Sequence, residues 1–184
     1  MEHTKKPYHP MYIANYIITF CTENGHELNN LKLQKIMYYL QAQSLVESDL
    51  PLFDENLQKW KYGPVVPTVY HEYKSHGASS IRTEDIGKII RTPYEGETPN
   101  FINTYIIEEY TSDKINIDDK YILDETVPVF AGYDSFYLVE QTHKHDIWRE
   151  DATNILLGLQ GIEYSNEEIK KYFESHYEEQ LWKR

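Results

Sequence analysis

The segment His143-Lys144-His145-Asp146 holds the side chains best suited to metal or acid–base chemistry. Two histidines one residue apart can share a metal on an extended backbone, but on a helix they point about 200° apart. A catalytic zinc needs about three protein ligands, and the sequence places no others at a zinc-site spacing. We therefore expect His143 to pack near a helix end and Asp146 to cap the next helix. A metal-dependent hydrolase that uses His143 and His145 remains the alternative.

Two further features suggest catalysis only superficially. Cys21 could be a nucleophile in an accessible, electropositive setting, but it shares an apolar helical stripe with Ala14 and Ile18. In such a stripe a free cysteine behaves as a small hydrophobic residue. The segment Gly158-Leu159-Gln160-Gly161 lacks the preceding strand and the Lys-Ser/Thr ending of a phosphate loop, so it reads as a turn. We expect no catalytic residues, no cofactor and no enzymatic activity.

The segment Trp60-Lys61-Tyr62-Gly63-Pro64-Val65-Val66-Pro67 suggests binding instead. Two large rings directly precede a glycine-proline corner, and each proline holds the residue before it in an extended conformation. A preorganised corner presents side chains at low entropic cost, as a binding surface requires. The other interpretation is that Trp60 and Tyr62 fill the protein core while the prolines position the next helix. Both interpretations stay open.

These residues must be positioned mainly by helices, because apolar side chains recur at helical spacing along most of the chain. We expect helices from Pro10 to Gly25, Leu31 to Glu47, Pro67 to Gly77, about Asp119 onward, Phe136 to His143, Asp146 to Leu159 and Ser165 to Gln180. The helix from Leu31 is apolar on two sides, which is typical of the central helix of a bundle. Pro128 should limit or kink its helix. Ser165 and Glu168 predict a capping box, in which each side chain bonds the other residue's backbone N–H.

Residues 83–118 interrupt this helical pattern with a polar stretch that contains Pro93, Gly96 and Pro99. Two β-leaning runs follow, Phe101–Ile107 and Lys114–Ile117, and an acidic turn separates them. We expect a β-hairpin here. The predicted fold is therefore a mainly α, compact multi-helix bundle with a short extended stretch at 56–62 and this small insertion. Residues 1–184 should form a single domain, with a variable insertion at about 83–118.

Amino-acid composition limits the kinds of partner that the chain can bind. The net charge is −12, and all of it comes from residues 93–184, which hold 20 acidic and 8 basic residues, whereas residues 1–92 hold 10 of each. Such a chain repels phosphate backbones, which disfavours direct nucleic-acid binding. It suits a basic partner or, as an alternative, an acidic nucleic-acid mimic of the anti-restriction kind. The 17 tyrosines should mostly pack in the core, with a minority at an interface.

The cellular location follows from what the sequence lacks. With one cysteine, Cys21, no intrachain disulfide can form, which is typical of a reducing compartment. The most apolar early run, Tyr12 to Cys21, is too short to cross a bilayer and has no small-residue cleavage site. We expect a cytoplasmic protein without a membrane partner.

Three sequence blocks carry a family resemblance. They are Leu31-Lys32-Leu33-Gln34-Lys35-Ile36-Met37-Tyr38-Tyr39, Pro51-Leu52-Phe53-Asp54-Glu55 and Trp60-Lys61-Tyr62-Gly63-Pro64-Val65-Val66-Pro67. Tyr70 to Gly77 matches as well, and weaker matches follow at Thr142-His143 with Trp148 and at Glu168 to Phe173. Over about two thirds of its length, the chain resembles the Panacea domain of the SocA-like, phage-associated antitoxins.

The resemblance implies an antitoxin that neutralises a protein toxin by direct contact and is encoded near that toxin, often on a prophage. Some relatives are described as adaptors that bring a toxin to a protease, so a protease is a further possible partner. The residues that the resemblance marks as partner-binding or motif residues are Lys35, Tyr39, Trp60, Tyr62, Gly63, Pro64, Val65, His143 and Trp148.

Overall fold

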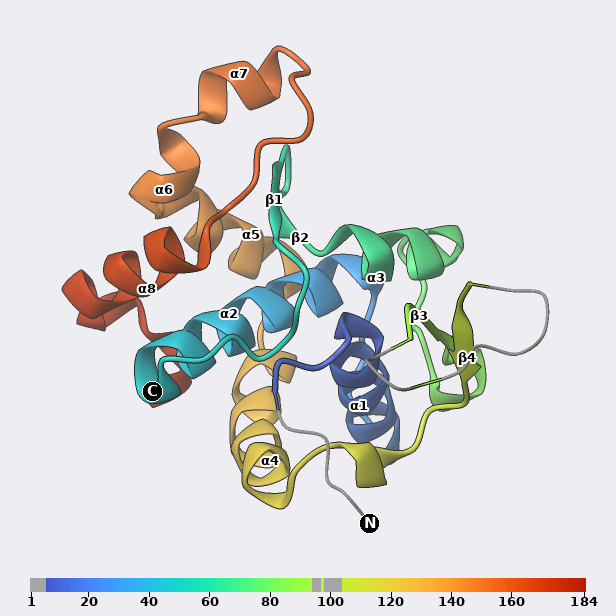
Figure 1. The fold of residues 1–184 in the computed structure, drawn as a ribbon. Helices are drawn as coiled ribbons and strands as arrows, with labels where there is room; N and C mark the ends of the chain where they lie inside the picture. Colours follow the sequence, from blue (N-terminus) through green and yellow to red (C-terminus); the bar gives the residue numbers. More distant parts are fainter. Residues whose placement is uncertain (1–5, 94–96, 98–103) are drawn as a thin grey trace.

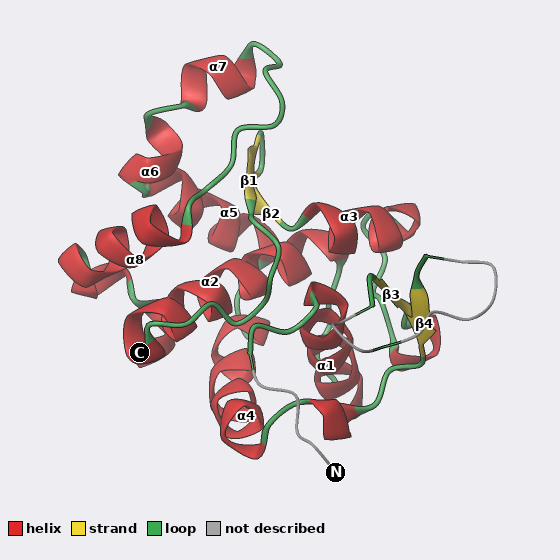
Figure 2. Ribbon diagram, in the orientation of Figure 1, coloured by secondary structure: helices red, strands yellow, loops and turns green. Residues whose placement is uncertain are grey.

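The computed structural model describes residues 6–93, 97 and 104–184. The α-helices are α1 (Pro10–Glu23), α2 (Asn30–Ser48), α3 (Pro67–Tyr73), α4 (Ile117–Ala131), α5 (Ser135–Lys144), α6 (Asp146–Arg149), α7 (Ala152–Leu156) and α8 (Asn166–Ser175). Strands form two small antiparallel ladders, β1 (Gln58–Trp60) with β2 (Gly63–Val65) and β3 (Ile89–Arg91) with β4 (Ile106–Glu108) (Figure 2). The predicted mainly α fold with a minor β component is confirmed. Among the described residues, no helix has the length and apolar character needed to cross a bilayer.

Helix α2 is the centre of the structure (Figure 1). It contacts α1, α3, α4, α5, α8 and strand β2, and most of its residues are buried. This confirms the central helix that the two apolar faces of the sequence predict. Six polar side chains of α2 are also buried, and they are Asn30, Gln34, Lys35, Gln41, Gln43 and Ser44. Because buried polar groups need hydrogen-bond partners, these residues tie α2 to its surroundings.

Side-chain caps fix the starts of three helices that the sequence predicts. Asn29 caps α2, its side-chain oxygen accepting from the backbone N–H of Lys32 at 2.9 Å. The carboxylate of Asp134 caps α5. Ser165 and Glu168 form the expected capping box at α8: each side chain accepts from the other residue's backbone N–H. The predicted starts are confirmed because these bonds join residues only two or three apart.

The extended stretch and glycine-proline corner expected around residues 56–67 form the β1–β2 hairpin. Trp60 lies opposite Gly63, so Lys61 and Tyr62 make a two-residue turn. The outer edge of β1 is covered by the segment before α8: the backbone N–H of Lys59 donates to the Ile162 carbonyl at 2.7 Å, and that of Tyr164 donates to Leu57 at 2.8 Å. The hairpin thus has backbone partners along this edge, which fixes its position.

The predicted pairing within residues 83–118 is wrong. The strand at Ile106–Glu108 pairs with Ile89–Arg91, which precedes it, rather than with Lys114–Ile117. Residues 112–117 instead form a 3₁₀ turn and the first residue of α4, because Asn116 caps that helix through the Asp118 N–H at 2.8 Å. Of their two apolar side chains, Ile115 is buried in the core and Ile117 is exposed. Gly96, Pro99 and residues 101–103 lie outside the described residues.

The predicted helix from Asp146 is also wrong. The helix expected from Asp146 to Leu159 is divided into α6 and α7, with His145 rather than Asp146 at the cap position. At the break, Asp151 takes the cap position of α7 and pairs with Lys59 of β1 at 2.8 Å, a long-range contact that helical periodicity does not reveal. Leu156 and Leu159, at the C-terminal end of the expected helix, are exposed.

Helices α4 and α8 also differ from expectation at their ends. Helix α8 ends at Ser175, so His176 and Gln180 lie beyond it, although the buried amide of Gln180 donates back to the Phe173 carbonyl at 2.6 Å. Pro128 does not limit α4, which continues to Ala131. A proline removes only one N–H from the helix, and tertiary packing of Val127, Phe130 and Ala131 into the core keeps the last turn in place.

Candidate partner-binding site

Lys35, in the middle of α2, contacts the inner side of the β1–β2 hairpin. It has no exposed surface, and its Nζ donates to the Pro64 carbonyl at 2.9 Å. No carboxylate among the described residues forms an ion pair with this ammonium group. Burial lowers the pKa of Lys35 to about 7. The lysine therefore holds the hairpin through one hydrogen bond and is near its titration point at neutral pH.

Gly63 permits the close approach of hairpin and helix. Its φ of 88° lies in the region that L side chains rarely adopt. A Cβ added there would lie 2.5 Å from Thr142 Oγ1 and 3.0 Å from Lys35 Cε. Both the backbone conformation and the available space therefore require glycine at this position.

The end of α5 and helix α6 hold the other side of the hairpin. The His143 ring stacks on Trp148 with ring centroids 3.9 Å apart, and Trp148 Nε1 donates to the Trp60 carbonyl at 3.0 Å. Burial and the nearby Lys35 ammonium lower the pKa of His143, which keeps its ring neutral at physiological pH. His143 therefore packs near a helix end, as the sequence predicts.

Two residues that the sequence analysis did not single out complete this anchoring. Gln34 Oε1 accepts from the Val66 N–H at 2.8 Å. Lys59 is buried, and its Nζ pairs with Asp151 and Glu168, each at 2.8 Å. Burial opposes its charge, but the two carboxylates raise the pKa of Lys59, so it stays protonated. Gln34 lies inside the first family block, whereas nothing local in the sequence predicts that Lys59 meets two distant carboxylates.

The outer side of the hairpin is open to solvent. The side chain of Tyr62 at the turn is 52% exposed, and the half-buried Trp60 ring packs edge-on against Tyr70 at 4.7 Å. Between hairpin, α2 and α3 lies a groove of about 270 Å³, which we call the α3 groove. It is lined by Asn30, Leu31, Gln34, Trp60, Lys61, Tyr62, Val65, Tyr70, Lys74 and Gly77.

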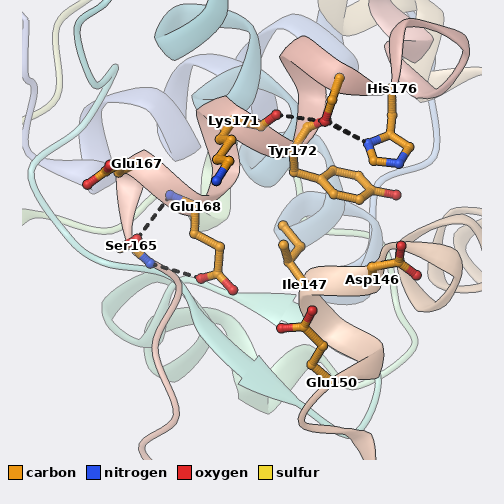
Figure 3. Close-up of a pocket in the computed structure, with 10 residues that line it drawn as sticks. Asp146, Ile147, Glu150, Ser165, Glu167, Glu168, Lys171, Tyr172 and His176 are labelled. Atoms are coloured by element: carbon orange, nitrogen blue, oxygen red, sulfur yellow. Dashed lines mark hydrogen bonds between the residues drawn. The ribbon is translucent and has the colours of Figure 1, made fainter.

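A second, larger pocket of about 450 Å³ lies between α6 and α8 (Figure 3). It contains four carboxylates, from Asp146, Glu150, Glu167 and Glu168, and one lysine, Lys171. Glu168 is already engaged with Ser165 and Lys59. This acidic pocket is where part of the negative charge of the C-terminal half gathers.

The structure brings most of the motif residues together. Lys35, Trp60, Gly63, Pro64, His143 and Trp148 form one contiguous cluster on and beneath the hairpin, with Val65 buried beside them and Tyr62 at the exposed tip. Tyr39 lies apart from this cluster, because its ring stacks on Phe130 of α4 at 4.8 Å. Thr142, at the end of α5, belongs to the cluster through its contact with the Gly63 position.

His145 and Cys21, the candidates for metal binding and nucleophilic catalysis, are both buried. The Nδ1 of His145 shares a hydrogen bond of 2.9 Å with the Tyr38 hydroxyl, and its Nε2 lies 3.3 Å from Glu179. Burial lowers the pKa of His145 to about 3, so its ring is neutral and this contact is not an ion pair. Burial also raises the pKa of Cys21 to about 11, so its thiol stays protonated at neutral pH. Within the described ranges, no three His, Cys, Asp or Glu side chains are grouped to hold a metal.

Comparison with known proteins identifies the family. Residues 33–149 match the model described as "Antitoxin SocA-like, Panacea domain", so the chain belongs to this family. The chain is also 32% identical over 78 residues to Antitoxin SocA of Caulobacter vibrioides (strain NA1000 / CB15N). That alignment covers 42% of each protein, so the chain spans less than half the length of this relative. No solved structure matches the chain significantly.

Proposed function

We propose that this protein neutralises a protein toxin by direct contact, and that the outer side of the β1–β2 hairpin carries the contact. The observation behind this proposal is the exposed Tyr62 on a hairpin whose inner side is fixed by Lys35, Gly63 and Trp148. A large ring on a rigid turn can bury apolar area against a partner with little loss of conformational entropy. Aromatic anchors of this kind dominate the energetics of protein interfaces.

The family supports the choice of partner. We propose that the toxin is encoded by a neighbouring gene, in a prophage or phage-derived operon, and that the protein acts in the cytoplasm without catalysis. Recruitment of a protease to the toxin would use a second surface, since the hairpin would be covered. Direct binding to nucleic acid is disfavoured by the net charge of −12.

Tyr62→Ala tests the proposed contact, with the product of the neighbouring gene as the partner. Because Tyr62 is half exposed, the variant should unfold within about 1 kcal/mol of the wild type. Loss of an interface anchor should cost about 2 kcal/mol of binding, or roughly thirtyfold in Kd, and should abolish rescue of growth in cells that express the toxin.

Tyr121→Ala is the matched control, because Tyr121 is an exposed tyrosine on α4, outside the hairpin. It should bind and rescue like the wild type. If Tyr62→Ala binds and rescues as well as Tyr121→Ala does, the hairpin is not the contact. If the wild type does not bind the neighbouring gene product at all, toxin neutralisation by direct contact with this partner is wrong.

A further inference from the structure

The α3 groove differs in charge from the protein as a whole. Its ten lining residues include two lysines and no aspartate or glutamate, although the protein carries a net charge of −12. Lys61 and Lys74 are both exposed, and neither forms an ion pair within the part of the chain that the structure describes. The ammonium group of Lys61 lies 5.6 Å from the centroid of the Tyr62 ring, a cation–π distance that holds it at the hairpin tip.

The carboxylates closest in sequence to Lys61 and Lys74 are directed elsewhere. The Glu72 carboxylate, on α3, packs against Gly87, and Glu55 accepts from the Thr68 N–H at the start of the same helix. Neither lines the groove. Within the described part of the chain, the two lysines therefore have no paired carboxylate to compete with an incoming anion.

The floor of the groove offers apolar contact rather than free polar atoms. Asn30 Nδ2 donates to the Tyr70 carbonyl at 3.1 Å, and Gln34 donates to Asn30 at 2.9 Å while accepting from Val66. With these amides engaged, the surfaces left for a partner are the rings of Trp60, Tyr62 and Tyr70 and the two ammonium groups. A volume of about 270 Å³ accommodates one or two side chains, not a folded element.

We propose that the α3 groove receives an acidic segment of the toxin, in which a large apolar side chain packs on Trp60 and Tyr70 while neighbouring carboxylates pair with Lys61 and Lys74. This inference rests on the proposed function and names the chemistry of the partner at that same site. It differs from what the net charge alone suggests, which is a basic partner. Exposed ion pairs contribute about 0.2–1 kcal/mol each, so they act mainly on orientation and association rate, with the rings supplying most of the affinity.

The test compares Lys61→Glu/Lys74→Glu with the wild type, using the purified product of the neighbouring gene as the probe. The double variant should bind at least tenfold more weakly at low salt, and the gap should narrow as salt rises, because screening removes the new repulsion. Lys61→Arg/Lys74→Arg keeps the charges and should bind like the wild type. Lys183→Glu/Lys144→Glu makes the same charge change at two exposed lysines outside the groove, so it should lower affinity far less.

A charge swap identifies the segment itself. Among Asp→Lys and Glu→Lys variants of the toxin, at least one should lose binding to the wild type and regain it with Lys61→Glu or Lys74→Glu. The proposal is overturned if the double variant binds as tightly as the wild type at all salt concentrations, or more tightly. In that case a loss caused by Tyr62→Ala would still support toxin contact through the hairpin, so the two proposals fail separately.

Discussion

The two sides of the β1–β2 hairpin contrast sharply although they share eight consecutive residues. On the inner side, Gly63 and Pro64 are buried against Lys35, and every contact is made within the protein. On the outer side, the side chains of Lys61 and Tyr62 face solvent and form no hydrogen bond or ion pair among the described residues. One motif thus holds residues that stabilise the fold next to residues that are free to bind. Substitutions on the inner side should reduce stability, and substitutions on the outer side should reduce binding.

The largest expected effect on the inner side comes from Gly63→Ala. The new Cβ would meet Thr142 Oγ1 at 2.5 Å on a backbone with φ of 88°. The left-handed conformation costs about 1–2 kcal/mol and overpacking about 1–3 kcal/mol, so we expect a loss of roughly 2–5 kcal/mol in the free energy of unfolding. Urea denaturation would measure it.

Gly25→Ala separates the cost of the left-handed backbone conformation from the cost of overpacking. Gly25 also has a positive φ, of 71°, but a Cβ there meets nothing within 4 Å. This control should therefore lose only about 1–2 kcal/mol. Equal losses in the two variants would mean that the hairpin does not press on α2 and α5 as the structure shows, and the contrast between its two sides would not hold.

A smaller effect is expected from Lys35→Met, and it should depend on pH. Burial lowers the pKa of Lys35 to about 7, whereas in the unfolded chain the lysine keeps its proton up to about pH 10.4. Between these values the unfolded state binds more protons, so the stability of the wild type rises with pH, and the cost of the buried charge is fully present below pH 7. From pH 6 to 8.5 this contribution should amount to roughly 2 kcal/mol.

Unfolding free energies measured at intervals from pH 6 to 8.5 should show this rise in the wild type relative to Lys35→Met. The upper limit matters because the raised pKa values of Cys21 and the buried tyrosines reduce stability at higher pH. Comparing the two proteins removes the contributions of other groups. Parallel pH profiles would show that Lys35 does not titrate in this window and that its contact with Pro64 does not involve a change of charge.

What the sequence predicts well is local. Caps at Asn29, Asp134 and Ser165 depend on residues two or three positions away, so their pattern is visible in the chain. The pairing of Ile89–Arg91 with Ile106–Glu108 and the break between α6 and α7 at Asp151 depend on partners far along the chain. No periodicity encodes such contacts, and the predictions at these two places are wrong for that reason.

The motif residues show the same limit. The types and spacing of Trp60, Tyr62 and Gly63 indicate a stiff corner with large rings, which the hairpin confirms. Which ring faces solvent depends on how α2, α5 and α6 surround the hairpin, through Lys35 and through the hydrogen bond from Trp148 to the Trp60 carbonyl. A single sequence leaves both orientations open, so the separation into an inner and an outer side needs the three-dimensional structure.

The smallest predicted effect, Ser165→Ala, tests how far the binding side extends. Ser165 Oγ accepts from the Glu168 N–H at 3.0 Å, and loss of this hydrogen bond should lower the free energy of unfolding by about 1 kcal/mol. The control is Ser79→Ala, at an exposed serine without a side-chain hydrogen bond among the described residues, and it should not change stability measurably. Glu168 keeps its ion pair with Lys59, so the hairpin should stay in place and toxin binding should be unchanged. Ser165 also lines the acidic pocket between α6 and α8. If Ser165→Ala weakened binding without lowering stability, the contact would lie at that pocket, a basic partner would be favoured, and the outer side of the hairpin would lose its special role.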